Sequence, residues 1–79
     1  MKTYVFQVEL ETDEDGWRAF YAPLEEIGAS TWGKTEGDAL ANIQEVLSMI
    51  MEELRDRNES IPATTQMTVA DGSLVTVHL

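Results

Sequence analysis

The fold is decided by the stretch Gly33-Lys34-Thr35-Glu36-Gly37-Asp38-Ala39-Leu40, where a short strand stops and one long amphipathic helix opens. Thr35 is a good helix N-cap, because its hydroxyl can accept a hydrogen bond from a backbone N–H of the first turn. The acidic residues Glu36 and Asp38 lie in that first turn, where they match the positive end of the helix dipole. The stretch therefore predicts a helix that begins at Glu36.

The predicted helix carries a single apolar stripe. Its apolar residues recur at spacings of three and four, as in a helix with one buried face, and they are Ala39, Leu40, Ile43, Val46, Leu47, Ile50, Met51 and Leu54. After Asn58 the helix is expected to end, because Pro62 pushes Ile61 out of the helical region. Met49 lies off the stripe, so it is either an ordinary exposed side chain or a contact for a partner.

Three strands are predicted before the helix. Their signals are a period of two along the first strand, the turn residue Gly16 with its tolerance of positive φ, and Pro23, which cannot donate to a ladder. In order, the expected elements are a strand over Tyr4–Leu10, a turn over Thr12–Gly16, a strand over Trp17–Ala22, a loop over Leu24–Gly28 and a short strand over Ala29–Lys34. Together the three strands form an antiparallel meander.

The end of the chain holds two further strand signals. The runs Gln66–Ala70 and Leu74–His78 flank Asp71-Gly72, a strong hairpin signal, and one or both should join the sheet. Because a strand, a helix and a returning strand favour a right-handed crossover, we expect the last strand beside the first and parallel to it. The fold class is thus α+β in one domain over residues 1–79: a meander, one helix on one face, and one or two C-terminal strands.

Composition limits the possible partners. Fifteen acidic and five basic residues give a net charge of −10, which repels phosphate backbones and anionic lipids. We therefore expect no direct nucleic-acid or membrane binding, and a basic partner if a charged one is bound, although acidic surfaces also serve solubility. The sequence has no cysteine, which fits a reducing cytoplasm. No apolar run approaches the roughly 20 residues that span a bilayer, and no signal peptide is recognisable.

Apolar residues on both faces of the predicted strands suggest an interface. In the second strand Trp17, Ala19 and Tyr21 share one face while Phe20 and Ala22 lie on the other, and Trp32 adds a third-strand aromatic. One helix covers only one face of a sheet, so aromatic residues on the other face point to a subunit or partner, unless they are ordinary exposed residues. The expectation is a homodimer or higher homo-oligomer.

Residues for catalysis are scarce. His78 is the only histidine, and we read it as an ordinary strand residue. The acidic groups Asp13-Glu14-Asp15 and Glu25-Glu26 fall in turns or loops without an apolar pocket, and the first lacks the ligand pattern of a calcium loop. We therefore assign no catalytic, cofactor-binding or metal-binding residue.

The chain resembles the HicB family, the antitoxins of prokaryotic toxin–antitoxin pairs. The similarity is carried by the strand Tyr4–Leu10, the acidic turn at Asp15-Gly16, the segment Tyr21-Ala22-Pro23-Leu24, and above all Gly33-x-Thr35-x-x-x-Ala39-Leu40-x-Asn42-Ile43 with a helix ending ahead of Ile61-Pro62. Two departures are Glu26-Ile27-Gly28-Ala29, where the family often has Leu-Pro-Gly-Cys, and Gly37-Asp38, where two acids are usual.

The resemblance implies a partial ribonuclease H-like fold that lacks the catalytic carboxylates of that enzyme. Family members bind and mask a small basic RNA-cleaving toxin, and longer members add a C-terminal DNA-binding segment. This sequence stops at Leu79, so no sequence-specific DNA binding by this chain alone is expected.

Three functions remain open at this point. The leading one is neutralisation of a basic toxin, steered by opposite charge, with contacts from the strand aromatics or from the outer helix face around Glu45, Glu52 and Glu53. The second is a stand-alone dimeric interaction module without a toxin. The third, from a different class, is an enzyme that uses clustered carboxylates and a divalent metal in a ribonuclease H manner.

Overall fold

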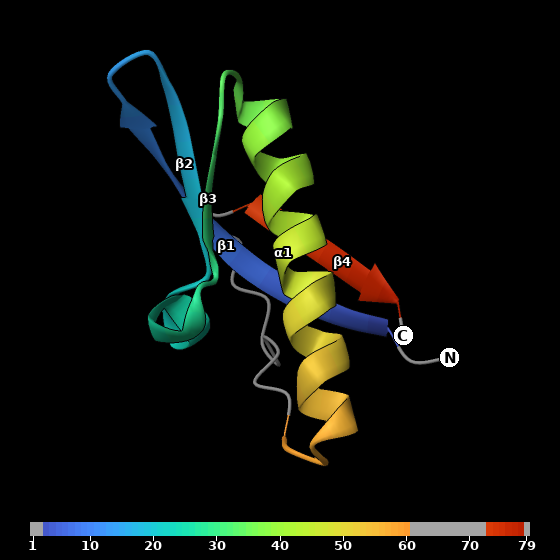
Figure 1. Cartoon of the computed structure of the whole chain (residues 1–79). Coiled ribbons are helices and arrows are strands. Elements are labelled where there is room, and N and C mark those ends of the chain that lie inside the picture. Colours follow the sequence, from blue (N-terminus) through green and yellow to red (C-terminus); the bar gives the residue numbers. More distant parts are fainter. Residues whose placement is uncertain (1–2, 61–72, 79) are drawn as a thin grey trace.

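A computed structural model describes residues 3–60 and 73–78. The elements in chain order are β1 (Thr3–Asp13), β2 (Gly16–Phe20), the 3-10 helix η1 (Ala22–Ile27), β3 (Ser30–Gly33), α1 (Glu36–Asp56) and β4 (Ser73–His78). Four antiparallel strands form one sheet in the order β3-β2-β1-β4, and α1 lies across one face of it (Figure 1). This arrangement confirms the α+β class, the antiparallel meander and the single long helix.

Both ends of α1 are defined by local hydrogen bonds. At the start, the side chain of Thr35 accepts from the backbone N–H of Asp38 at 3.0 Å, as the cap prediction required. At the other end Asn58 has a φ of 61°, and the N–H of Glu59 donates to the carbonyl of Leu54 at 2.9 Å. This left-handed residue and its backbone bond satisfy carbonyls of the last turn, so the helix stops before Pro62 is reached.

The core lies between α1 and the sheet. All eight residues of the predicted stripe face it, with Ala39, Ile43, Leu47 and Met51 fully buried and the other four partly buried. The sheet contributes Phe6, Val8, Ala19, Val75 and Val77, η1 adds Leu24, and Tyr21 lies between β2 and η1. Alternation along β1 therefore works as predicted, since the even-numbered residues face the helix and the odd-numbered ones face away.

Two amides on α1 tie the helix to both edges of the sheet. Asn42 Nδ2 donates to the carbonyl of Trp32 in β3 at 2.8 Å, and Gln44 Nε2 donates to the carbonyl of Thr76 in β4 at 2.7 Å. Strands β3 and β4 are the two outer strands. Each amide therefore hydrogen-bonds a backbone carbonyl of an edge strand and fixes α1 to that strand.

The direction predicted for the last strand is wrong. Strand β4 does lie beside β1, but it is antiparallel, with Ser73 opposite Val8 and His78 opposite Thr3. The end of α1 lies near Tyr4, because residues 58–60 line a hollow with that side chain. A parallel strand would have to begin there. The described chain instead resumes at Ser73, opposite Val8, and β4 runs from there toward Thr3.

Smaller differences concern the connections. The segment predicted as a loop over 24–28 is largely the 3-10 helix η1, which begins with Pro23 in its first turn and ends at Gly28 with a φ of 104°. In the β1–β2 turn the positive φ, 43°, belongs to Glu14 and not to Gly16. The predicted strand Gln66–Ala70 and its turn at Asp71-Gly72 lie outside the described residues.

Candidate protein-interaction surfaces

We call the sheet face that α1 leaves uncovered the open face. Its two halves differ in character. The strand register puts Arg18 between Trp32 and Glu11 at the β2–β3 end. At the β1–β4 end the open face carries Thr3, Val5, Gln7, Leu74, Thr76 and His78. The first half is rich in charge and aromatic rings, whereas the second carries no carboxylate side chain on its described residues.

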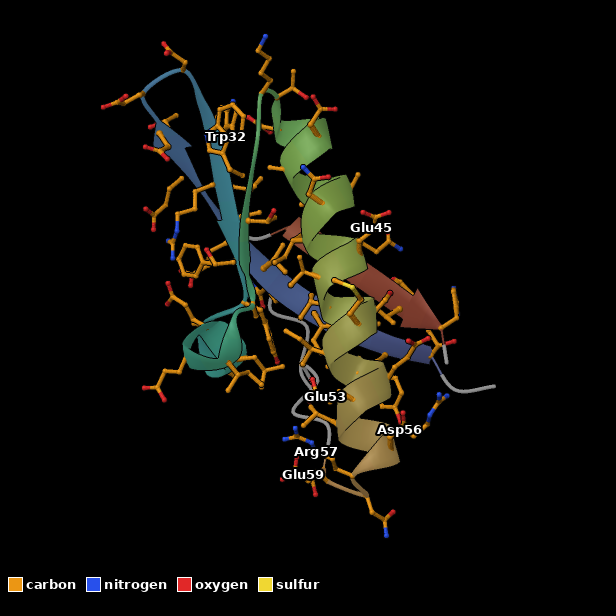
Figure 2. All side chains as sticks on the ribbon, in the orientation of Figure 1. Trp32, Glu45, Glu53, Asp56, Arg57 and Glu59 are labelled. Carbon is orange, nitrogen blue, oxygen red and sulfur yellow. The ribbon has the colours of Figure 1, made fainter. Side chains whose placement is uncertain are left out.

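The indole of Trp32 lies against Gly16 of the β1–β2 hairpin. Its side chain is 45% exposed, and a Cβ built on Gly16 would lie 2.4 Å from Trp32 Cζ2 and 2.6 Å from the carbonyl oxygen of Gly33. Position 16 is therefore glycine because the indole and the neighbouring strand occupy the space of a side chain, and not because the backbone needs positive φ. Figure 2 shows Trp32 at this end of the sheet.

Phe20 lies on the open face as predicted, but it is not available to a partner. Its side chain is only 8% exposed. The guanidinium carbon of Arg18 lies 4.1 Å above the centre of the Phe20 ring, and Arg18 also pairs with Glu25 and, at 3.4 Å, with Glu11. The only arginine of this face thus covers the aromatic ring and is itself held by two carboxylates.

Trp17, the third aromatic proposed for an interface, faces the other way. It pairs with Thr12 in the β1–β2 register and packs, partly buried, against the core beneath α1. Sequence alternation had already grouped Trp17 with Ala19 and Tyr21, both of which are buried. Trp17 is therefore an edge residue of the core, and Trp32 is the exposed aromatic of this end.

The outer side of α1 is acidic around one exposed apolar side chain. Met49 is 63% exposed, and with Gln44, Glu45, Ser48 and Glu52 it lines a shallow hollow of about 500 Å³. Residues 45, 49 and 52 are spaced by four and three, so they follow one line along the helix. Glu53 lies to the side of this line, where it pairs with Arg57 at 2.6 Å.

Most of the described cations already have acidic neighbours. Arg18 pairs with two glutamates and Arg57 with Glu53, while Arg55 Nε lies 3.9 Å from Asp56. Within residues 3–60 and 73–78, Glu45 and Glu52 have no ion pair. The outer side of α1 therefore carries negative charge that the described part of the chain does not neutralise.

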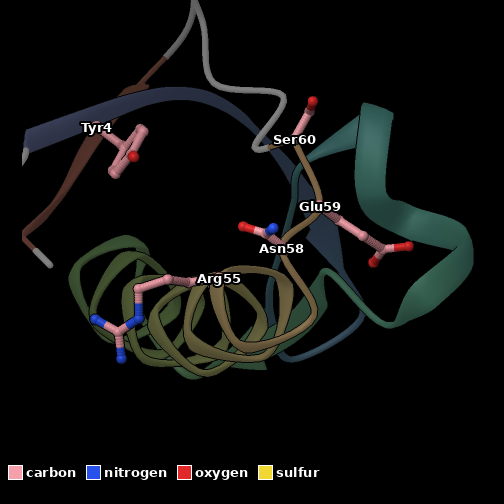
Figure 3. A pocket seen from close by; sticks show the side chains of 5 residues that line it. All are labelled: Tyr4, Arg55, Asn58, Glu59 and Ser60. Atoms are coloured by element: carbon pink, nitrogen blue, oxygen red, sulfur yellow. The ribbon is translucent and has the colours of Figure 1, made fainter.

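A second hollow, of about 420 Å³, lies at the C-terminal end of α1. It is lined by Tyr4, Arg55, Asn58, Glu59 and Ser60. Figure 3 shows Tyr4 reaching in from β1 and the carboxylate of Glu59 pointing away from it, toward η1. A third hollow, about 400 Å³, brings exposed Ile27 of η1 next to Ile50 and Leu54, with Glu53, Arg57 and Glu59 also lining it. Neither hollow holds a nucleophile placed beside a general base.

The strand position predicted for the one histidine is correct. His78 is a strand residue, and its Nδ1 lies 3.0 Å from the hydroxyl of Thr3 on the adjacent strand. In the described part of the chain no three acidic or histidine side chains gather closely enough to hold a metal ion. Among the described helices, none combines the length and the apolar character needed to cross a bilayer.

Comparisons of the chain with protein-family models, with curated proteins and with solved structures found no match in any of the three. The surfaces described above are therefore interpreted from their own residues. Sequence reasoning named Trp32, Met49, Glu45 and Glu52 as surface contacts, and the structure leaves all four accessible. It missed Leu74, half exposed on the open face, because the side to which that strand residue points depends on its register with β1.

Proposed function

We propose that this protein is a cytoplasmic antitoxin-like binding protein, which neutralises a small basic RNA-cleaving toxin by covering the toxin's surface. It acts by binding and not by catalysis. The sequence resemblance to HicB antitoxins suggests the class of partner. The observation that carries the proposal is the outer side of α1, where Met49 is exposed between Glu45 and Glu52 and neither acid has an ion pair within the described residues.

This surface suits a basic protein for two physical reasons. Opposite charge speeds the diffusional encounter, and it excludes acidic partners by repulsion. A methionine side chain is flexible and polarisable, so it adapts to the apolar stems of lysine and arginine as well as to apolar side chains. The apolar centre then supplies contact area while the glutamates on either side select for positive charge.

The proposal is tested by co-purification with the basic product of a neighbouring reading frame. We expect a complex with a Kd below about 1 μM, a usual affinity for a specific complex. The double change Glu45→Gln and Glu52→Gln should weaken it about 10- to 100-fold, because two charges are removed from the contact. The control, Glu26→Gln with Glu59→Gln, removes the same charge elsewhere and should change Kd less than about threefold.

Two results would contradict this function. One is the lack of any complex between the unaltered protein and the basic product at tens of micromolar. The other is an equal weakening by the helix pair and by the control pair, which would mean that net charge acts without a defined surface. Toxin activity measured as RNA cleavage should fall to background when the unaltered protein is in excess.

A second candidate, a dimeric interaction module without a toxin, is favoured by one observation. The β1–β4 half of the open face combines half-exposed Leu74 and partly buried Val5 with neutral neighbours. In a chain of net charge −10, two copies repel each other over most of their surface, so a neutral apolar area is where they can meet.

We expect a dimer in sedimentation at micromolar concentration. Leu74→Glu should convert it to a monomer, because two new carboxylates would face each other across the contact. The matched control is Ile27→Glu, since Ile27 is 58% exposed but lies on η1 and away from this face. A monomeric unaltered protein, or dissociation by both variants alike, would contradict the assignment.

A further inference from the structure

We propose that Trp32 binds an arginine side chain of the basic partner by stacking, with Asp13 as the carboxylate beside it. The inference rests on the function proposed above and assigns to the open face a second, separate contact. Its occupant is an arginine-rich segment of another protein.

The indole ring of Trp32 is held in position by its neighbours. The indole covers the backbone of Gly16 so closely that no side chain fits there, and the backbone carbonyl of Trp32 is held by Asn42. One side of the ring is therefore seated on the hairpin while 45% of the residue stays exposed. A large aromatic surface that is fixed in place by its own fold loses little entropy when a partner binds it.

The surroundings of Trp32 carry negative charge. The indole covers Gly16 of β2. Asp13 of β1 is directly opposite Gly16 in the strand register, so its carboxylate is on the adjacent strand. Glu14 and Asp15 form the turn that joins these two residues. Lys34 follows Trp32 by two residues, and it is the one described cation close by in sequence that has no ion pair. Arg18, which is opposite Trp32, is already paired with Glu11 and Glu25, so the three carboxylates against one ammonium leave this end of the sheet negative and complementary to a cation.

Arg18 and Phe20, on the same face, already form a stacked pair of this kind. Arg18 already stacks on Phe20, at 4.1 Å from the ring centre, with Glu11 and Glu25 beside its guanidinium. The protein thus satisfies one arginine internally with an aromatic ring and two carboxylates. Trp32 and Asp13 present the same kinds of group outward, and within the described residues no arginine occupies them.

These observations favour arginine over lysine and over a second copy of this chain. A guanidinium is planar and weakly hydrated, so it stacks on an indole and donates to a carboxylate at the same time, whereas an ammonium is a strongly hydrated point charge. A second copy would bring its own Asp13, Glu14 and Asp15 to the same place, where like charges repel.

The test uses the full chain with Trp17→Phe, which leaves Trp32 as the only tryptophan. The probes are three synthetic peptides of equal length, rich in arginine, lysine or glutamate. We expect the arginine peptide to change the emission of Trp32 and to saturate, the lysine peptide to bind at least about threefold more weakly, and the glutamate peptide to have no effect.

Affinity is measured independently by the anisotropy of a labelled arginine peptide. Trp32→Ala should weaken binding about 3- to 30-fold, and Trp32→Phe should retain part of it because a smaller ring remains. Asp13→Asn should weaken it as well, whereas Trp17→Phe alone should change it less than about twofold. Circular dichroism establishes that each variant is folded. Trp32→Phe and Asp13→Asn keep the test decisive if Trp32→Ala does not fold.

The outcomes separate this inference from the proposed function. Unchanged emission of Trp32, or equal binding of the arginine peptide by Trp32→Phe, Asp13→Asn and the unaltered protein, overturns the stacking site. Equal affinity for the lysine and arginine peptides also overturns it, since charge alone would then account for binding. The toxin-binding proposal survives these results if the Glu45 and Glu52 changes still weaken the complex with the basic neighbouring product, and it fails if no such complex forms.

Discussion

Gly33→Ala is expected to remove a large part of the protein's unfolding free energy. A Cβ at this position would lie 2.3 Å from the backbone nitrogen of Ala39, 2.7 Å from the carbonyl carbon of Asp38 and 2.8 Å from the Cα of Ala39. These are backbone atoms in the first turn of α1, so no side-chain rotation relieves the overlap. The helix start would have to move away from β3, and the Thr35 cap and the contact of Ala39 with the core would be disturbed together.

The expected size is about 3 kcal/mol or more of lost unfolding free energy, in the range of severe packing defects. A domain of this length has a total stability of about 5 to 10 kcal/mol, so the change removes a large part of it. The measurement is urea unfolding followed by circular dichroism. Gly37→Ala is the matched control from the same stretch.

The space beside Gly37 is open, whereas the space beside Gly33 is filled by backbone atoms of α1. A Cβ at Gly37 would meet only the Thr35 hydroxyl oxygen, at 3.9 Å. Alanine has the higher helix propensity, so this control should raise stability by about 0.5 kcal/mol. A Gly33→Ala protein as stable as the unaltered one would mean that α1 does not touch the end of β3 as described here.

Leu47→Ala is expected to lower the unfolding free energy by about 2 to 5 kcal/mol. Leu47 is fully buried in the middle of the stripe that α1 presents to the sheet. The loss combines the transfer free energy of the removed atoms with the cavity that rigid neighbours leave unfilled. The readout is the shift of the urea midpoint at unchanged slope, which reports stability without a change in the surface exposed on unfolding.

The control for this change lies two residues further along the same helix. Met49 is 63% exposed, so Met49→Ala should alter stability by less than about 0.5 kcal/mol. The same variant is predicted to weaken partner binding through the outer side of α1. Similar losses of unfolding free energy for Leu47→Ala and Met49→Ala would show that the face of α1 that packs on the sheet is not the one that contains Leu47.

The helix could be predicted closely because its signals are local. Thr35 caps the first turn and the apolar residues repeat with the helical period, whereas the last turn ends at left-handed Asn58, ahead of the stop predicted from Pro62. Each of these depends on residues within a few positions of each other, so no distant part of the chain can overrule it easily. The same holds for β1, whose alternation correctly indicated which side faces the core.

The candidate surfaces could be predicted only in part. Exposure of Met49, Glu45 and Glu52 followed from their positions opposite the apolar stripe. Phe20 was placed on the correct face but is covered by Arg18, a residue two positions earlier that is itself held by Glu11 and Glu25. Periodicity predicts the face of the sheet on which a side chain lies, but it does not predict which other side chains cover that side chain.

By itself the sequence determined the elements and their inward faces, because capping, periodicity and turn residues act over a few positions along the chain. Only the tertiary structure decided the antiparallel direction of β4, the need for glycine at position 16 beneath Trp32, and the hydrogen bonds of Asn42 and Gln44 to carbonyls of the two edge strands. Each of these depends on residues far apart in the chain that meet only when α1 packs on the sheet, and a steric or hydrogen-bonding requirement between them has no local pattern.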